Sequence, residues 1–206
     1  MDDLYKLFHL CAYDVDYEQV GDSVNYAFQE GVNDLYIFFQ GSNSITDWVE
    51  NFLFSKKVYG EFRVHRGFLM AYNQVRSIVL DKIYSKTYDK VIVVGYSHGG
   101  ALATLCHEDI KYHFPKIELH TYAFESPRCV KAKKDIRKRW NDLCVIRTNQ
   151  DIVCHCPPKI FGYDDLGTML KVKGDTSLVK NRLPKCIKSH YPQVVLNALE
   201  KLREKN

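Results

Sequence analysis

The run Val91-Ile-Val-Val-Gly-Tyr-Ser-His-Gly-Gly100 is the most informative part of this 206-residue sequence. Its first four residues are apolar and mostly branched, which is typical of a strand buried on both faces of a parallel sheet. The pentapeptide Gly95-Tyr-Ser-His-Gly99 follows at once and fits the pattern G-x-S-x-G, and a helix is predicted from there to about Lys111. A strand, a sharp turn and a helix in immediate succession predict a serine exposed at the carboxyl edge of a sheet.

Ser97 lies at the centre of this turn. A serine hydroxyl is a poor nucleophile unless a base can take its proton and hydrogen-bond donors can stabilise the oxyanion. The positions two before and two after the serine must be very small, because the flanking backbones crowd together, and both are glycine here. The pattern therefore predicts Ser97 as a nucleophile. The alternative is a glycine-rich turn with a bystander serine, which the strand-then-helix context disfavours.

Apolar runs on both sides of this motif alternate with helical patterns. Strands are predicted at 35–39, 117–124 and 144–147, and helices at 2–12, 16–30, 67–84 and from about 192 onwards. A further helix is predicted after the strand 117–124, with an apolar face made of Cys129, Ala132, Ile136 and Trp140. This alternation is typical of an α/β protein with a mainly parallel central sheet and helices on both faces. With the serine turn it predicts an α/β-hydrolase fold, and the length predicts a single domain over residues 1–206.

Chain order selects the acid that would accompany Ser97, because triads of this fold run serine, acid, histidine. Asp151 comes just after the predicted strand 144–147. The carboxyl ends of parallel strands are where open α/β sheets place their sites, so Asp151 is the predicted acid. The other candidates are interpreted as solvated acids of a polar loop that no strand precedes: Asp164, Asp165 and Asp175.

Eight histidines are candidates for the base. Five of them precede the acid and break the chain order: His9, His65, His107, His113 and His120. His98 adjoins the serine and heads the next helix, so its backbone N–H is the useful part. His155 is too close in sequence to Asp151 for an acid that must orient a separate imidazole. His190 remains, in a loop just before the last helix, and is the predicted base.

With these residues assigned, the sequence resembles the fungal-type class 3 lipase family, which includes feruloyl esterases and phospholipases A1. The resemblance covers about residues 34–200 and rests on motifs in order: Phe39-Gln-Gly-Ser-Asn-Ser-Ile-Thr-Asp-Trp48, Val64-His-Arg-Gly-Phe-Leu-Met-Ala-Tyr72, Gly95-Tyr-Ser-His-Gly-Gly-Ala-Leu-Ala103, Tyr122-Ala-Phe-Glu-Ser-Pro-Arg128, Asn149-Gln-Asp-Ile-Val153 with Pro157-Pro158, and Ser189-His190. It implies a serine hydrolase with Ser97 as nucleophile, His190 as base and Asp151 as the acid that holds the imidazole tautomer.

The resemblance also implies roles outside the triad. Ser42, through its backbone N–H and its hydroxyl, would form the oxyanion hole together with the backbone N–H of His98. Residues 44–52 correspond to the family's lid helix, whose apolar, substrate-facing positions would be Ile45, Trp48, Val49 and Phe52. The same helical spacing also fits an ordinary amphipathic helix fixed on the core, and both interpretations stay open.

Three places depart from the family pattern. Gln40 stands where the family usually has arginine, His98 replaces the usual leucine, and Cys154-His155-Cys156 replaces a more apolar stretch. These changes remove no catalytic group, so they bear on the pocket and on specificity. Structural zinc usually shows two well-spaced ligand pairs, which this stretch lacks. We therefore expect free thiols and a neutral histidine there, and neither a metal nor a cofactor.

Composition limits partners and location. A net charge of +4 is too mild and too dispersed to suggest a nucleic-acid partner. The longest apolar runs are too short for a transmembrane segment, and the first ten residues lack the pattern of a signal peptide. Seven cysteines without the spacing of a small disulfide scaffold then indicate reduced thiols and a cytoplasmic protein. A secreted location is the alternative, if a signal peptide has been removed.

The leading functional hypothesis is hydrolysis of a lipid ester such as a triacylglycerol through an acyl-serine intermediate, with transient contact with a lipid surface. The enzymatic alternatives are a soluble short-chain or feruloyl-type esterase and a phospholipase A1. The alternative from another class is an inactive binding module of the same fold, which loss of a triad residue would favour. Because the triad is common to all these enzymes, the sequence does not select the acyl chain, the head group or the oligomeric state.

Overall fold

The computed structural model describes residues 3–21, 24–41, 55–132 and 139–205. Several predicted features lie outside these ranges: Ser42, the four apolar positions of the proposed lid (Ile45, Trp48, Val49 and Phe52), and Ile136 of the helix predicted after Cys129.

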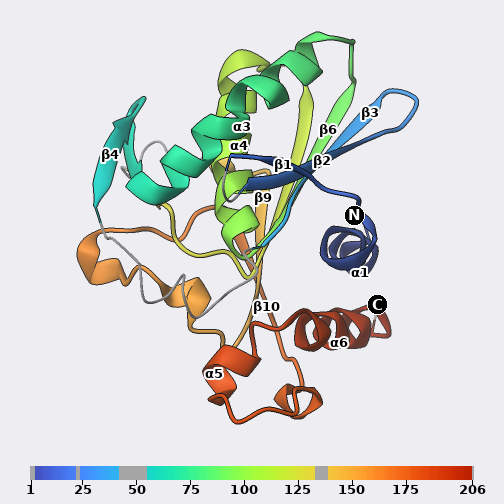
Figure 1. Ribbon diagram of the computed structural model, residues 1–206, viewed down its shortest axis with the longest axis vertical. Helices are drawn as coiled ribbons and strands as arrows, with labels where there is room; N and C mark the ends of the chain where they lie inside the picture. The colour runs from blue at the N-terminus through green and yellow to red at the C-terminus, as the bar shows by residue number, and fades with distance from the viewer. Residues whose placement is uncertain (1–2, 22–23, 42–54, 133–138, 206) are drawn as a thin grey trace.

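A seven-stranded sheet forms the centre of the molecule, in the order β1-β2-β3-β6-β7-β9-β10 (Figure 1). Its strands are β1 (Glu18–Val20), β2 (Val24–Glu30), β3 (Asp34–Phe39), β6 (Lys90–Tyr96), β7 (Glu118–Phe124), β9 (Leu143–Thr148) and β10 (Thr168–Val172). Every neighbouring pair from β3 to β10 is parallel, whereas β1 and β2 add an antiparallel edge. The predicted mainly parallel sheet is confirmed.

Helices cover both faces of this sheet, as predicted (Figure 1). Helices α3 (Arg66–Tyr84) and α4 (His98–His113) lie on one face, and α1 (Leu4–His9) and α6 (Pro192–Arg203) lie on the other. A π-helical turn, Leu10–Asp14, follows α1. The short helix α5 (Lys185–Lys188) comes just before the loop that leads into α6.

The central strands supply both cores because successive side chains of a strand point to opposite faces. On β6, Val91 and Val93 join the core beneath α3 and α4, whereas Ile92 and Val94 join the core beneath α1 and α6. All four are essentially inaccessible to solvent. Both faces of this strand are thus covered, which explains why its sequence is an uninterrupted apolar run.

A second, antiparallel sheet is formed by β4 (Lys56–Tyr59), β5 (Phe62–His65) and β8 (Val130–Lys131). Its buried side chains Phe62, Val64 and Val130 belong to the same core as α3, α4 and one face of the central sheet. This sheet and the strand β10 were not predicted from the sequence.

The helix predicted at 16–30 is wrong, and the helix predicted after Cys129 is wrong at its start, the part that precedes the undescribed residues 133–138. Residues 16–30 contain the antiparallel strands β1 and β2 instead of a helix. The segment after Cys129 begins with strand β8, which pairs with β5. In both places the apolar spacing is compatible with either structure, and hydrogen bonds to a strand distant in sequence decide it: Phe39 of β3 pairs with Tyr26, and Val64 of β5 pairs with Val130.

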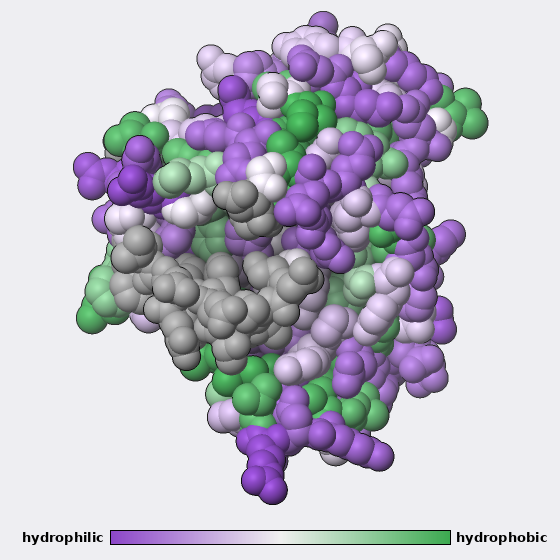
Figure 2. Space-filling model, in the orientation of Figure 1, coloured by the Kyte–Doolittle hydropathy of each residue, from purple (hydrophilic) through white to green (hydrophobic). Residues whose placement is uncertain are grey.

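The surface of the described part of the chain is mainly polar on the face seen in Figure 2, where hydrophobic residues form separate small groups. No helix in the described ranges combines the length and the apolar character needed to cross a bilayer. All seven cysteines fall within these ranges, and each is a free thiol.

Candidate active site

The turn between β6 and α4 holds Ser97 in a constrained backbone conformation. Its φ and ψ angles are 57° and −121°, which residues other than glycine rarely adopt. A Cβ atom on Gly95 would lie 2.1 Å from the carbonyl oxygen of Gly99, and one on Gly99 would lie 2.1 Å from that of Phe39. The structure therefore confirms why these two positions flanking the serine are glycine.

We expect Gly95→Ala to destabilise the protein by about 2–4 kcal/mol, because the new methyl group overlaps backbone atoms that cannot move separately. Displacement of the turn also removes Ser97 from its partners, so labelling of Ser97 by a fluorophosphonate should slow at least tenfold. Gly60→Ala is the matched control, since a Cβ there meets no atom within 4 Å and only the positive φ is strained. Thermal unfolding and labelling rates measure both effects, and equal behaviour of the two variants would contradict the steric argument.

Three loops bring the predicted triad together. The Nε2 atom of His190 lies 2.7 Å from the Ser97 hydroxyl oxygen, and its Nδ1 atom lies 2.5 Å from Oδ2 of Asp151. Ser97 follows β6, Asp151 follows β9, and His190 precedes α6. Asp151 and His190 are fully buried, and Ser97 is 6% exposed. This geometry permits transfer of the hydroxyl proton to the imidazole.

The position of His190 is fixed from two directions. Its ring stacks on Tyr96 with centroids 5.3 Å apart, and the Tyr96 hydroxyl donates a hydrogen bond to the His190 carbonyl oxygen. The hydroxyl of Thr148, at the end of β9, lies 3.1 Å from the carbonyl oxygen of the preceding residue, Ser189, and donates to it. The base is thus attached to the ends of the strands that carry the nucleophile and the acid.

His155 does not join this group. Its side chain is exposed, its Nδ1 atom lies 3.5 Å from Nη2 of Arg128, and its carbonyl oxygen accepts a hydrogen bond from the same guanidinium at 2.6 Å. Partial burial and the positive charges of Arg128 and Arg147 lower the pKa of the His155 imidazole. The imidazole is therefore neutral at neutral pH, as expected from the sequence, and our choice of His190 over His155 as the base remains a prediction.

Asp151 is held as a carboxylate. Its Oδ1 atom accepts the backbone N–H of Val153 at 2.9 Å, and its Oδ2 atom accepts hydrogen bonds from His190 and from the Cys154 thiol, the latter at 3.2 Å. Burial alone would raise the pKa of this carboxyl, but attraction to His190 and the surrounding hydrogen bonds outweigh it and lower the pKa. The acid can therefore orient the imidazole and stabilise its protonated form.

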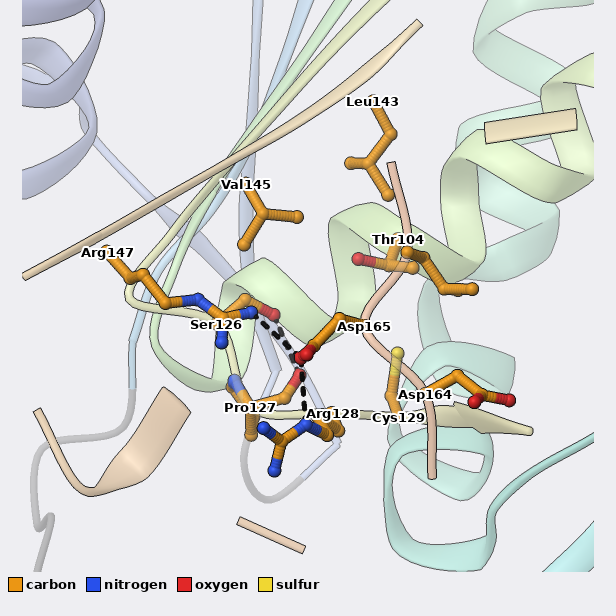
Figure 3. A pocket seen from close by; sticks show the side chains of 11 residues that line it. Thr104, Ser126, Pro127, Arg128, Cys129, Leu143, Val145, Arg147, Asp164 and Asp165 are labelled. Atoms are coloured by element: carbon orange, nitrogen blue, oxygen red, sulfur yellow. Dashed lines mark hydrogen bonds and ion pairs between the residues drawn. The ribbon is translucent and has the colours of Figure 1, made fainter. Parts of the chain in front are cut away.

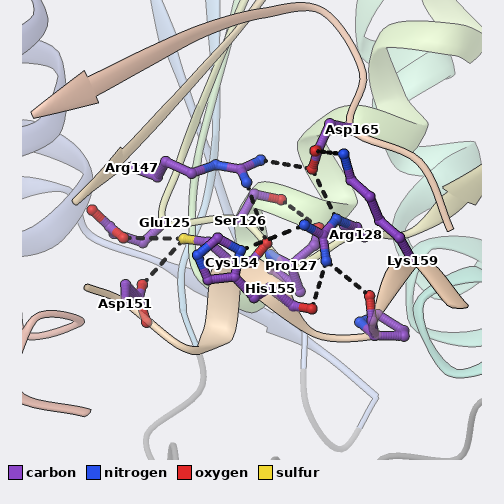
Figure 4. A network of polar contacts seen from close by, with 11 residues as sticks. Glu125, Ser126, Pro127, Arg128, Arg147, Asp151, Cys154, His155, Lys159 and Asp165 are labelled. Atoms are coloured by element: carbon purple, nitrogen blue, oxygen red, sulfur yellow. Dashed lines mark hydrogen bonds and ion pairs between the residues drawn. The ribbon is translucent and has the colours of Figure 1, made fainter. Parts of the chain in front are cut away.

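Sequence reasoning missed two residues of this site, Glu125 and Cys154 (Figure 4). Glu125 is the first residue after β7, is fully buried, and has a φ of 48°. The Cys154 thiol lies 3.1 Å from Oε2 of Glu125. Glu125 lies in the motif Tyr122–Arg128, and its place just after a strand of the parallel sheet is the signal that would have identified it.

A network of charged residues anchors the loop that follows Asp151 (Figure 4). The carboxylate of Asp165 accepts hydrogen bonds from Nε of Arg128 at 2.8 Å and from Nη2 of Arg147 at 3.2 Å, and it pairs with Lys159 at 2.6 Å. Partial burial opposes its charge, but these cations lower its pKa. The prediction that Asp165 is a solvated acid is wrong, because the fold places it beside two buried guanidinium groups. Asp175 is exposed, as predicted.

A small cavity lies beside this network (Figure 3). It has a volume of about 20 Å³, and its lining includes Ser126, Arg128, Arg147 and Asp165. Sites for small molecules commonly measure about 300–1,000 Å³. This cavity is therefore too small for an ester substrate.

The side chain of His98 lies against Phe68 of α3, with ring centroids 5.5 Å apart. Burial, and then the neighbouring His65, lower its pKa to about 4, so the imidazole is neutral at neutral pH. The loop after β3 reaches the nucleophile, because a Cβ on Gly41 would lie 3.2 Å from Cβ of Ser97. Gln40 is fixed to β2, where the Asn25 amide donates to its Oε1 atom at 2.8 Å.

Comparison with known proteins places this geometry in a family. Residues 36–161 match the model of the family described as Lipase (class 3). A lipase from Rhizopus niveus is 34% identical over 159 residues, which are 71% of this chain and 40% of that protein. The secreted mono- and diacylglycerol lipase 1 of Fusarium solani is 27% identical over 140 residues, 63% of this chain and 41% of that protein. The chain thus spans about two fifths of the length of these relatives.

Among solved structures, a triacylglycerol lipase described as having a serine protease triad at its catalytic centre superimposes with a TM-score of 0.66 and 27% identity. The match covers 80% of this chain and 69% of that one. The similarity confirms the predicted α/β-hydrolase arrangement. The cytoplasmic location expected from the sequence gains no support from these relatives, one of which is named as secreted.

Proposed function

Because the chain belongs to the class 3 lipase family, we propose that it hydrolyses carboxylic esters of lipids, such as acylglycerols, through an acyl-serine intermediate. The observation that carries this proposal is the line of hydrogen bonds from Ser97 through His190 to Asp151, with distances of 2.7 and 2.5 Å. All three groups stand in the order and the connectivity that acyl transfer requires.

In the proposed reaction, His190 Nε2 takes the proton of Ser97 as the hydroxyl attacks the ester carbonyl carbon. Asp151 keeps the proton of the imidazole on Nδ1 and stabilises the imidazolium that forms. His190 then gives its proton to the leaving alcohol, and a water molecule, activated by the same base, releases the acid.

The oxyanion of each tetrahedral intermediate needs at least two donors. We assign these to the backbone N–H of His98 and to Ser42. The start of α4 directly after Ser97 supports the first assignment, since helix N-termini present free N–H groups. The contact of Gly41 with the Ser97 turn supports the second, because it brings the residue before Ser42 against the nucleophile.

A lipid substrate is supported by the relatives named as lipases and by exposed apolar side chains in the segment that follows β9. Ile152, next to Asp151, is 42% exposed, and Ile160 and Phe161 on the following turn are 87% and 45% exposed. We propose that they take part in transient contact with a lipid surface. Residues 44–52 remain our proposed lid, and the core shared by the two sheets supports one domain over the chain.

The test is a rate profile over p-nitrophenyl esters of increasing chain length, below and above the solubility limit, with the Ser97→Ala protein as background. We expect the rate to rise with acyl length and to rise again when the substrate forms aggregates. Highest rates on short, dissolved esters would favour the soluble esterase instead. No turnover above the Ser97→Ala background, on any of these esters, would favour the inactive binding module.

A further inference from the structure

A buried cluster of two carboxyl groups and a thiol adjoins the triad (Figure 4). Oε2 of Glu125 lies 3.1 Å from Sγ of Cys154, and the same sulfur lies 3.2 Å from Oδ2 of Asp151. All three residues are fully buried. Glu125 directly follows β7, and Asp151 and Cys154 lie in the segment that follows β9, the parallel neighbour of β7 in the sheet.

Electrostatics decides which carboxyl group in this cluster is charged. Two carboxylates that share one buried site cannot both ionise without a large energetic penalty. Asp151 has an imidazole as its partner, whereas Oε1 of Glu125 accepts a neutral backbone N–H, that of Thr148, at 2.6 Å. Burial and the neighbouring Asp151 raise the pKa of Glu125 well above its usual value. The shared proton therefore belongs to Glu125.

We propose that Glu125 is a positioning residue of the triad, acting as a neutral acid through the Cys154 thiol on the orientation of Asp151. Its hydroxyl donates to the sulfur, the thiol donates to Oδ2 of Asp151, and the same carboxylate receives Nδ1–H of His190. In this chain of hydrogen bonds, which runs from Glu125 to Ser97, each hydrogen atom takes part in a single hydrogen bond. This inference rests on the proposed function only in taking Ser97 as the nucleophile.

The backbone at Glu125 gives independent support. Its φ of 48° lies in the left-handed region, where glycine is the favoured residue and a long side chain is strained. The strain is compensated at this position by the contacts of the carboxyl group with Thr148 and Cys154. A purely structural turn would have no need of a carboxyl group here.

Two other ionisable groups lie close to the cluster, Tyr96 and Arg147, and neither changes the assignment of a protonated Glu125 and an ionised Asp151. The hydroxyl of Tyr96 donates to the carbonyl oxygen of His190, and burial raises the pKa of this hydroxyl well above the usual value, so it stays neutral. The guanidinium of Arg147 faces the cluster from β9, where Nη1 lies 3.5 Å from the Cys154 carbonyl oxygen, but it is paired with Asp165 at 3.2 Å.

The first test compares Glu125→Gln with Glu125→Gly, using the rate at which a fluorophosphonate labels Ser97 as a function of pH. Glutamine is neutral and keeps a hydrogen-bond donor and an acceptor. We therefore expect Glu125→Gln to be labelled within about threefold of the wild-type rate, and the labelling rate to fall at the same acidic pH as in the wild-type protein. Glycine suits the backbone conformation but removes the side chain, so the rate of Ser97 labelling should fall about tenfold or more. Losses of about this size are typical in metal sites when a residue that hydrogen-bonds to a metal ligand is removed.

Two results would overturn the proposal. If Glu125 were ionised, Glu125→Gln would remove a negative charge near the base, and the acid limb would move to lower pH by about one unit. If Glu125 had only a structural role, Glu125→Gly would label as fast as wild type once rates are expressed per folded molecule. Because labelling of Ser97 requires no particular ester, a failure of the proposed lipid substrate would appear separately, in the turnover assay.

A second pair of variants tests the thiol and stands even if Glu125→Gly fails to fold. Cys154→Ser keeps a group that both accepts and donates a hydrogen bond, so labelling should stay within about threefold of wild type. Cys154→Ala interrupts the line and should slow labelling about tenfold. Cys106→Ala is the control for loss of a buried thiol elsewhere, in α4, and should label at the wild-type rate. Equal rates for the alanine and serine variants of Cys154 would contradict the proposal.

Discussion

Ser97→Ala is expected to abolish labelling by a fluorophosphonate and to lower kcat for ester hydrolysis by roughly 10⁵–10⁶-fold. The reason is geometric: the hydroxyl of Ser97 lies 2.7 Å from the base, on a turn whose strained backbone holds it at the carboxyl edge of the sheet. Removing one oxygen atom from this position should leave the fold intact. Mass spectrometry of the labelled protein and its thermal unfolding measure the two parts of this prediction.

Ser126→Ala is the matched control. Ser126 also follows a parallel strand, β7, but its hydroxyl donates to the carbonyl oxygen of Pro127 at 3.0 Å and has no imidazole partner among the described contacts. It should therefore be labelled neither in the wild-type protein nor in the Ser97→Ala protein, and Ser126→Ala should keep the wild-type labelling rate. Persistent labelling of the Ser97→Ala protein would disprove the assignment of the nucleophile.

His190→Ala is expected to lower kcat by at least about 10²–10⁴-fold, the usual contribution of a general base, and by more if the triad acts as a unit. The imidazole is fully buried and contacts both the nucleophile and the acid, so no other described group is placed to take over its proton transfer. Steady-state kinetics on a dissolved p-nitrophenyl ester measures the loss.

The matched variant is His155→Ala, which removes an exposed imidazole close to the acid in sequence but bonded to Arg128 instead. We expect less than about a threefold change in kcat, because this ring contacts no member of the triad in the described structure. A loss at His155 as large as that at His190 would reverse the choice of base, whatever the distances in the structure.

The sequence predicted the nucleophile because the constraint on it is local. Gly95 is required by a contact within the turn, with the carbonyl oxygen of Gly99, whereas Gly99 is required by the end of the neighbouring strand β3, at Phe39. This constraint is visible in the sequence as a glycine two residues before and two residues after Ser97. Asp151 and His190 could be predicted because chain order and the carboxyl edge of a parallel sheet leave few candidates, and the structure places both beside the serine.

The errors have a common physical origin. Residues 16–30 and the segment after Cys129 carry apolar spacings that a helix and a strand can both use. Their actual structure depends on strands that are distant in sequence and accept them as partners, β3 for β2 and β5 for β8. In the same way, Asp165 has the sequence environment of a solvated acid and becomes an ion-pair partner only when Arg128 and Arg147 are brought beside it.

The sequence by itself thus determined the α/β class and predicted the strained serine turn and the three proposed members of the triad, since these follow from local sterics and from the order of elements along the chain. Only the tertiary structure decided what surrounds Asp151. Glu125 and Cys154 lie 29 residues apart in the chain, and their contact exists because β7 and β9 are neighbours in the sheet. Which carboxyl group carries the proton is decided by burial and by the imidazole of His190, and neither is a property of any short stretch of sequence.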